Sequence, residues 1–389
     1  MLIEKLTISN LLSFGPEPMT IDLGPLNVLI GPNGSGKSNF LDVIELIRAL
    51  PGDISAVFRD GGGVREWGWK FGDESYHEVR LSTVFTIRDE SIPFSRELIQ
   101  DFEIVVSDDH FMISEETIRA TDIEEFPTAF FCMKQQTAYV LEEGIAVPFV
   151  DKSSRNDKSI LAKIKDYRRY VEISELGDTL PKIALYRDWR FGRQTIPRTP
   201  QRADMPNGTL LPDASNLGLV LNRLRQTIDA KNKFLTSLRQ LYDGIDDFDV
   251  RINGGYVQPF LHEGERLIPA SRLSDGTLRY LCLLAILCDP DPPPLICIEE
   301  PELGMHPDVL PTIAGLLKDA STRTQLIVTT HSDILVDALT DTPEAVIVCE
   351  KHDGATKMQR LTDQNIGHWL EKYRLGELWT RGQIGGNRW

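Results

Sequence analysis

The segment Gly31-Pro-Asn-Gly-Ser-Gly-Lys-Ser38 is the stretch from which the rest of this sequence can be interpreted. It matches the P-loop pattern, and it lies between an apolar strand predicted at Leu26–Ile30 and a helix predicted over Asn39–Leu50. Glycines let backbone N–H groups wrap phosphates, and the N-terminus of the helix adds its dipole. The pattern predicts that Lys37 reaches the β- and γ-phosphates and that the Ser38 hydroxyl binds Mg²⁺.

A second group of short motifs lies far downstream of this loop. Leu273-Ser-Asp-Gly-Thr277 is followed by the apolar strand Leu295–Ile298 and then by Glu299-Glu300-Pro-Glu-Leu-Gly-Met-His306. A further apolar strand ends at Thr330-His331-Ser332. Each motif alone is weak evidence, but four motifs in this order are specific.

In these residues the chain resembles ABC-type ATPases of the RecF/SMC/OLD group. Leu273–Thr277 is similar to their signature motif, Ile296–Glu300 to the Walker B strand, Pro301–His306 to the D-loop and His331 to the switch histidine. The resemblance covers about the first fifty residues and Ala270–Leu339. It implies an ATPase head of the kind found in bacterial defence systems. OLD-type proteins carry a TOPRIM nuclease domain after the head, but the 39 residues that follow Glu350 contain no Asp-x-Asp, so we expect a stand-alone head without that domain.

The resemblance implies hydrolysis of ATP with Mg²⁺ as cofactor. The implied catalytic residues are Glu300, which would orient and deprotonate the attacking water, Lys37, and His331, which would sense the γ-phosphate. Glu299 would hold Mg²⁺ together with Ser38, although the family usually has Asp at that position. The full set of residues expected to bind the nucleotide is Gly31, Asn33, Gly34, Ser35, Gly36, Lys37, Ser38, Asn39, Ser274 and Gly276.

The same resemblance implies a head-to-tail dimer. Ser274 and the Gly276 backbone would complete the nucleotide site of a second copy of the chain. Two parts of the family pattern are altered or ambiguous. The N-terminal strand ends in Asn10-Leu-Leu-Ser-Phe14, with no basic residue at the third position. The glutamine that links nucleotide to the helical region could be any of three residues, Gln135, Gln136 or Gln194.

The pattern along the chain predicts an α/β fold, an ABC-type P-loop NTPase head with an antiparallel β subdomain and a helical insertion. We expect a P-loop lobe with an antiparallel sheet over 1–150, a helical insert over 151–247, and a signature and Walker B lobe over 248–389. The clearest helical segment in the insert is Asn216–Tyr242, whose leucines recur at spacings of three, four and seven, and we expect a packed amphipathic helix or a short hairpin arm there.

Composition points to a cytoplasmic protein. The 389 residues carry 42 Lys and Arg against 58 Asp and Glu, a net charge of −16. The longest apolar run, Tyr280–Cys288, is far shorter than the roughly 20 residues of a membrane-spanning helix. The five cysteines lie in apolar runs without a C-x-x-C pair, so we expect reduced core residues.

A basic island interrupts the acidic chain. Asp151–Tyr170 and Arg187–Arg202 together hold twelve Lys and Arg and four Asp, a net charge of +8. Five arginines, at Arg187, Arg190, Arg193, Arg198 and Arg202, are therefore candidates for nucleic-acid binding, with Trp189 and Phe191 available to stack on bases. Pairing of these arginines with the acidic body is an equally weighted alternative.

The functional expectation is an ATP-dependent switch that controls a partner effector, such as a nuclease encoded separately, in anti-phage defence. One alternative is a DNA repair or recombination ATPase that clamps DNA. Another is a scaffold that assembles on ATP and rarely hydrolyses it. The glycine-rich tail Gly376–Trp389 could pack on its own domain or dock on a partner.

Overall fold

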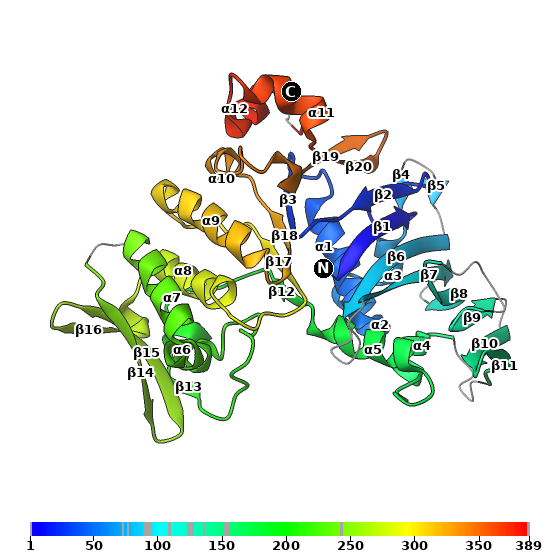
Figure 1. Cartoon of the computed structure of the whole chain (residues 1–389), viewed down its shortest axis with the longest axis horizontal. Helices are drawn as coiled ribbons and strands as arrows, with labels where there is room; N and C mark the ends of the chain where they lie inside the picture. Colours follow the sequence, from blue (N-terminus) through cyan, green and yellow to red (C-terminus); the bar gives the residue numbers. More distant parts are fainter. Residues whose placement is uncertain are drawn as a thin grey trace.

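A six-stranded sheet carries the P-loop at the centre of the molecule (Figure 1). The computed structural model describes residues 2–71, 74–75, 78–88, 95–107, 110–122, 128–134, 137–150, 156–241 and 244–386. The central strands, in spatial order, are β12 (Ala184–Tyr186), β17 (Leu295–Glu299), β18 (Gln325–Thr329), β3 (Leu26–Ile30), β19 (Val346–His352) and β20 (Ala355–Arg360). The first five run parallel and β20 is antiparallel to β19.

The central sheet is buried on both faces, which explains its nearly continuous apolar strands. Alternate residues face two separate cores, so that Val28 and Ile298 pack with one and Leu29 and Cys297 with the other. The first core includes the helices α8 (Asp275–Leu287) and α9 (Leu310–Ala320). The second includes α1 (Lys37–Ala49) and the antiparallel sheet.

The second core is closed by an eight-stranded antiparallel sheet of order β11-β10-β9-β8-β7-β6-β1-β2. Its strands are β1 (Ile3–Ser9), β2 (Met19–Asp22), β6 (Glu78–Arg88), β7 (Ser95–Ser107), β8 (His110–Ala120), β9 (Phe131–Lys134), β10 (Thr137–Glu142) and β11 (Ile145–Pro148). This sheet confirms the predicted antiparallel subdomain. Shorter elements of this lobe are α2 (Ile54–Asp60), α3 (Val64–Trp67), β4 (Lys70–Phe71), β5 (Glu74–Ser75), α4 (Ile160–Lys163) and α5 (Val171–Thr179).

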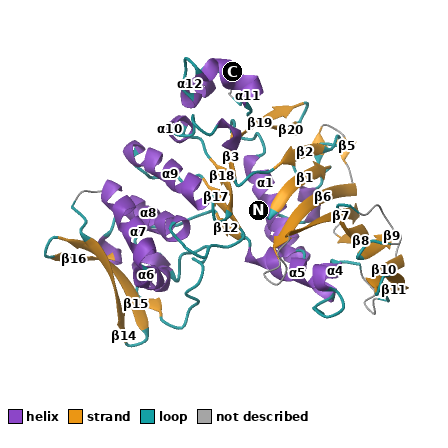
Figure 2. Ribbon diagram, viewed as in Figure 1, coloured by secondary structure: helices purple, strands orange, loops and turns teal. Residues whose placement is uncertain are grey.

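A second lobe lies on the other side of the central sheet, where a group of helices packs beside a small antiparallel sheet (Figure 2). The sheet contains β13 (Gln201–Arg202), β14 (Asp247–Asn253), β15 (Tyr256–Glu263) and β16 (Arg266–Pro269). Of the two alternatives for 216–242, one uninterrupted helix is wrong. The structure has α6 (Leu217–Gln226) and α7 (Ile228–Leu241), separated at Thr227, whose backbone is extended.

The C-terminal segment packs on its own chain. It contains α11 (Asp363–Leu370) and α12 (Leu375–Thr380), and α12 lies against α10 (Asp333–Asp337) with Leu375 and Leu378 fully buried. Beyond α12, the Gly386 amide donates to Glu350 Oε1 at 2.8 Å. The final residues Asn387–Trp389 lie outside the described residues.

Several further features bear on the expectations from sequence. All five cysteines are buried, and burial raises the pKa of the Cys349 thiol to about 12. Among the residues that the structure describes, no helix has the length and apolar character needed to cross a bilayer. The three-lobe division at 150 and 247 stays a prediction, and the structure places β12, from the predicted insert, in the central sheet.

Single turns of 3-10 helix are η1 (Leu180–Lys182), η2 (Ile196–Arg198), η3 (Ala270–Arg272), η4 (Pro307–Val309) and η5 (Pro343–Ala345).

Candidate nucleotide-binding site

The glycines of the P-loop are required by its backbone and by its neighbours. Gly31, Gly34 and Gly36 have φ angles of 152°, 78° and 98°, a region that disfavours side chains. A Cβ atom at Gly31 would lie 2.2 Å from the Cys349 carbonyl oxygen, and one at Gly36 would lie 2.2 Å from Thr356 Oγ1. A Cβ at Gly34 would meet nothing within 4 Å, so the loop is open on that side.

The polar groups of the loop suit a phosphate ligand. Gly36 is the N-cap of α1 and supplies no side-chain bond to the first turn, so the first N–H groups of the helix point toward any ligand in the loop. Lys37 Nζ donates to the carbonyl oxygens of Gly31 at 2.8 Å and Pro32 at 3.0 Å, and burial lowers its pKa. The buried Ser35 hydroxyl has no hydrogen-bond partner among the described residues. These groups fit a triphosphate.

The two expected metal ligands are in direct contact. Ser38, in the first turn of α1, donates from its hydroxyl to Glu299 Oε1 at 2.5 Å, and Glu299 is the last residue of β17. Hydroxyl and carboxylate oxygens are the ligands that Mg²⁺ prefers, so the pair fits the metal. Of the other expected nucleotide contacts on this side of the site, Asn33 is an exposed residue of the loop and Asn39 is a half-buried residue of α1.

The expected catalytic carboxylate follows Glu299 in a strained conformation. Glu300 has a φ of 45°, which is uncommon for a residue with a side chain and which turns it away from the strand direction. Its Oε1 lies 3.4 Å from His331 Nε2, and both side chains are about one-third exposed, at 30% and 35%. The structure therefore brings the two predicted catalytic side chains together at the carboxyl edge of the parallel sheet.

Glu302, which the sequence suggests is a D-loop or structural carboxylate rather than a catalytic one, makes structural hydrogen bonds. Its Oε1 accepts hydrogen bonds from Thr330 Oγ1 at 2.8 Å and from the His331 amide at 2.7 Å, so it holds the backbone of His331 in place. Burial raises the pKa of Glu302, and its Oε2 atom has no hydrogen-bond partner among the described residues. Glu302 therefore has a structural role, because it fixes the backbone at His331.

The signature-like segment is held firmly by its surroundings. Ser274 caps α8, and its hydroxyl oxygen accepts from the Thr277 amide at 3.0 Å. Gly276 faces the loop after β17, where a Cβ atom would lie 2.6 Å from the Gly304 carbonyl oxygen. The buried Arg198 guanidinium donates to the Leu273 carbonyl oxygen and to the Asp275 carboxylate, fixing the segment from the other side.

The five arginines proposed for nucleic acid occupy different environments. Arg187 belongs to the nucleotide site, because its Nε donates to Glu299 Oε2 at 2.9 Å. Arg198 is buried, and Arg202 forms an ion pair with Asp204. Arg190 and Arg193 are exposed. In the sequence, nothing beyond its place after the three residues of β12 distinguishes Arg187 from the other four arginines.

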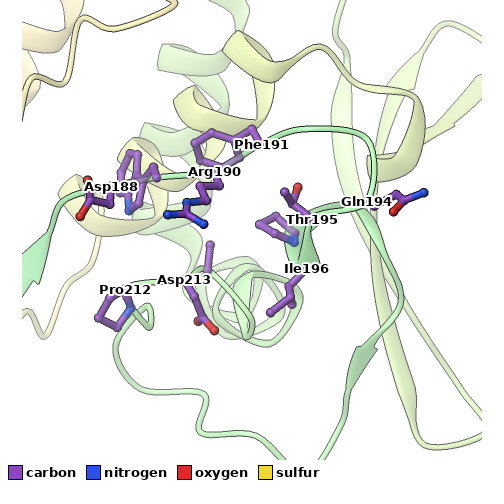
Figure 3. A pocket seen from close by; sticks show the side chains of 11 residues that line it. Asp188, Arg190, Phe191, Gln194, Thr195, Ile196, Pro212 and Asp213 are labelled. Atoms are coloured by element: carbon purple, nitrogen blue, oxygen red, sulfur yellow. The ribbon is translucent and has the colours of Figure 1, made fainter. Parts of the chain in front are cut away.

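The aromatic residues of the basic island are already in contact with a cation of the protein. The Arg279 guanidinium lies 5.5 Å from the centre of the Trp189 ring and 5.7 Å from that of Phe191. A cavity of about 390 Å³ opens beside them, lined in part by Arg190, Gln194 and Asp213 (Figure 3). Gln194 thus faces this cavity, and the alternative glutamines at 135 and 136 lie outside the described residues.

The fold is similar to that of solved SMC head domains over nearly the whole chain. An Smc head bound to the C-winged helix domain of ScpA has a TM-score of 0.60 at 16% identity, covering 92% of this chain and 97% of that chain. An Smc head with an extended coiled coil, bound to the C-terminal domain of ScpA from Pyrococcus furiosus, has a TM-score of 0.59 at 14% identity, covering 95% and 98%. An Smc head with a coiled coil and joint from Pyrococcus yayanosii has a TM-score of 0.54 at 11% identity, covering 95% and 99%.

A family model gives a match in sequence as well. A search of curated protein sequences found no match. The model described as "AAA domain, putative AbiEii toxin, Type IV TA system" matches residues 26–337. That range contains the P-loop, both carboxylates at the end of β17, the signature-like segment and His331. The chain therefore belongs to this AbiEii toxin-associated family of AAA domains and has an SMC head-like fold.

Proposed function

We propose that the protein binds Mg-ATP between two copies of the chain and hydrolyses it to ADP and phosphate, as a switch that acts on a partner effector. The observation that carries the catalytic part is the meeting of the P-loop and two side-chain pairs at one edge of the central sheet. The open P-loop, the Ser38–Glu299 pair and the Glu300–His331 pair converge at the carboxyl ends of β3, β17 and β18.

The residues have separable roles in this reaction. The Lys37 ammonium would exchange the carbonyl oxygens of Gly31 and Pro32 for phosphate oxygens, and the N–H groups of α1 would bind the same phosphates. Mg²⁺, held by Ser38 and Glu299, would neutralise charge on the phosphates. Glu300 orients the attacking water and accepts its proton, while His331 positions the Glu300 carboxylate from 3.4 Å.

The signature-like segment supports the two-copy arrangement. Ser274 lies at the N-terminus of α8, a helix of thirteen residues whose dipole favours a bound anion. The segment is held by Arg198 and Gly304 rather than by the P-loop of its own chain. The resemblance to ABC-type heads implies that it faces the nucleotide of a second copy. The effector role rests on the family description, which refers to toxin–antitoxin systems.

Mass in solution tests the proposal directly. We would measure light scattering for the wild type, Glu300→Gln and Lys37→Ala, each with and without Mg-ATP. ATP should drive self-association that Glu300→Gln prolongs, because nucleotide stays bound without hydrolysis, and that Lys37→Ala abolishes. A monomer that ignores ATP in the wild type and in Glu300→Gln would contradict the composite site.

Turnover assays then separate the switch from its rivals. Steady release of phosphate that falls in Glu300→Gln supports an ATPase. Effector function that survives loss of turnover in Glu300→Gln would favour a scaffold. Stimulation of turnover by duplex DNA would favour the DNA-clamping alternative.

A further inference from the structure

Both carboxylate oxygens of Glu299 are already occupied by groups of the protein. Oε1 accepts from the Ser38 hydroxyl at 2.5 Å, and Oε2 accepts from Arg187 Nε at 2.9 Å. Glu299 is the residue that the proposed function assigns to Mg²⁺. In the nucleotide-free protein, a divalent cation would therefore have to compete with a bound guanidinium for this ligand.

Arg187 is fixed in this position from its other side. Its Nη1 donates to Asp42 Oδ1 at 2.6 Å and lies 3.7 Å from Glu45 Oε2, and both acidic residues belong to α1. Its Nη2 reaches the Ser38 carbonyl oxygen at 3.5 Å. The arginine side chain is only 22% exposed, so solvent screens these interactions weakly. One cation thus joins three carboxylates around the metal position.

We propose, building on the proposed function, that Arg187 is a positioning residue that makes metal binding depend on nucleotide. The guanidinium takes the place of a divalent cation among Glu299, Asp42 and Glu45 and keeps Glu299 Oε1 turned toward Ser38. Phosphate oxygens of the nucleotide then supply the further ligands that a hard cation needs. Without nucleotide, the positive charge of Arg187 offsets part of the negative charge of these three carboxylates. A divalent cation is therefore attracted less strongly than it would be by three free carboxylates.

Arginine is required here because of its shape. Its planar fork presents Nε to Glu299 and Nη1 to Asp42 at the same time, whereas a lysine ammonium is a single point charge. Lysine at position 187 would retain the positive charge but would lose the simultaneous contact with both carboxylates. Arg187→Lys therefore separates the effect of charge from the effect of orientation.

The test measures Mn²⁺ binding without any nucleotide, by electron paramagnetic resonance of the free ion. Wild-type protein should bind Mn²⁺ weakly, and Arg187→Gln should bind it at least tenfold more tightly, because three carboxylates lose their cation. Arg187→Lys keeps the positive charge, so its Mn²⁺ affinity without nucleotide should remain close to wild type, whereas its turnover of Mg-ATP should fall because Glu299 is no longer oriented by the guanidinium. The gain should vanish in the double variant Arg187→Gln with Glu299→Gln. Equal Mn²⁺ affinity in the wild type and Arg187→Gln, or a gain that survives loss of Glu299, would overturn the proposal.

A second measurement excludes simple damage to the fold. Turnover of Mg-ATP in Arg187→Gln should fall by about 10–100-fold, the usual effect of removing a partner of a metal ligand, while nucleotide-free Mn²⁺ affinity rises. General unfolding would lower both. The Mn²⁺ experiment needs no hydrolysis, so it tests the role of Arg187 even if the protein binds ATP without hydrolysing it. In that case the ATPase proposal fails while the role of Arg187 stands.

Discussion

The P-loop and the signature-like segment both begin a helix, but they differ in how their polar groups are satisfied. The N-cap of α1 is a glycine without a side-chain bond, and the nearby Ser35 hydroxyl lacks a partner among the described residues. The N-cap of α8 is Ser274, whose hydroxyl bonds its own helix, and the buried Arg198 binds the preceding carbonyl group.

This difference indicates that the two helix N-termini are suited to different kinds of contact with one ligand. Unsatisfied donors in a buried loop cost free energy, typically about 1–3 kcal/mol each, so they persist where a ligand will satisfy them. In the signature-like segment the capping hydroxyl of Ser274 and the preceding Leu273 carbonyl oxygen are instead bonded within the chain, which suits a rigid surface presented to another molecule. In the proposed function, the P-loop encloses phosphate and the signature-like segment of a second copy is placed against it.

The largest expected effect is on kcat, and it should distinguish Glu300 from Glu302, which is hydrogen-bonded to the His331 amide. Glu300→Gln should lower kcat by about 100-fold or more, because it removes the group that accepts the proton from water. Glu302→Gln should leave kcat within a few-fold of wild type, since an amide oxygen can still accept from Thr330 and from the His331 amide. Phosphate release under saturating Mg-ATP measures both. An equal loss of kcat in Glu300→Gln and Glu302→Gln, both folded, would mean that Glu302 also takes part in hydrolysis.

A smaller effect should follow from loosening the signature-like segment. Arg198→Met leaves the Leu273 and Phe191 carbonyl oxygens without their buried donor, at a cost of about 2 kcal/mol in unfolding free energy. ATP-driven self-association should be lost, while binding of a fluorescent nucleotide to the monomer is retained. Arg202→Met, which removes an exposed arginine paired with Asp204, is the matched control and should change neither. Loss of nucleotide binding in Arg198→Met would show that the two segments are not separable.

The smallest effect concerns the cap itself. Ser274→Ala should lower the free energy of unfolding by about 1 kcal/mol, because α8 loses its N-cap, whereas Ser274→Asp should keep the cap and the stability. Both variants lack the hydroxyl, so both should lose ATP-driven association. Thermal unfolding and light scattering on the same samples separate the two roles. Association that survives in Ser274→Asp would mean that the cap, and not the hydroxyl, is what the second copy requires.

Local patterns were sufficient to predict the parts of the site that are continuous in sequence. The P-loop could be identified because glycine spacing, strand and helix are all adjacent, and Glu299 and Glu300 because they end a buried strand. The antiparallel sheet was predictable from alternating apolar residues. These features depend on neighbours within about ten positions.

The features that the sequence could not give depend on distant partners. Arg187 bonds Glu299 and Asp42 across 112 and 145 positions, and in sequence it is one arginine among five. The strand that places it, β12, has only three residues. The break at Thr227 was equally hidden, because the leucine spacing continues across it and only packing distinguishes one helix from two.

The attachment of both ends of the described chain to the central sheet has a practical consequence for engineering. The amides of Leu2 and Ile3 donate to the buried side chain of Gln325 at the start of β18, and the Gly386 amide is held by Glu350 on β19. An affinity tag or fluorescent protein fused at either end would therefore pull on strands that flank the P-loop strand. The turn Gly254–Gly255 between β14 and β15 is exposed and has open space around it, which makes it the better place for an inserted label.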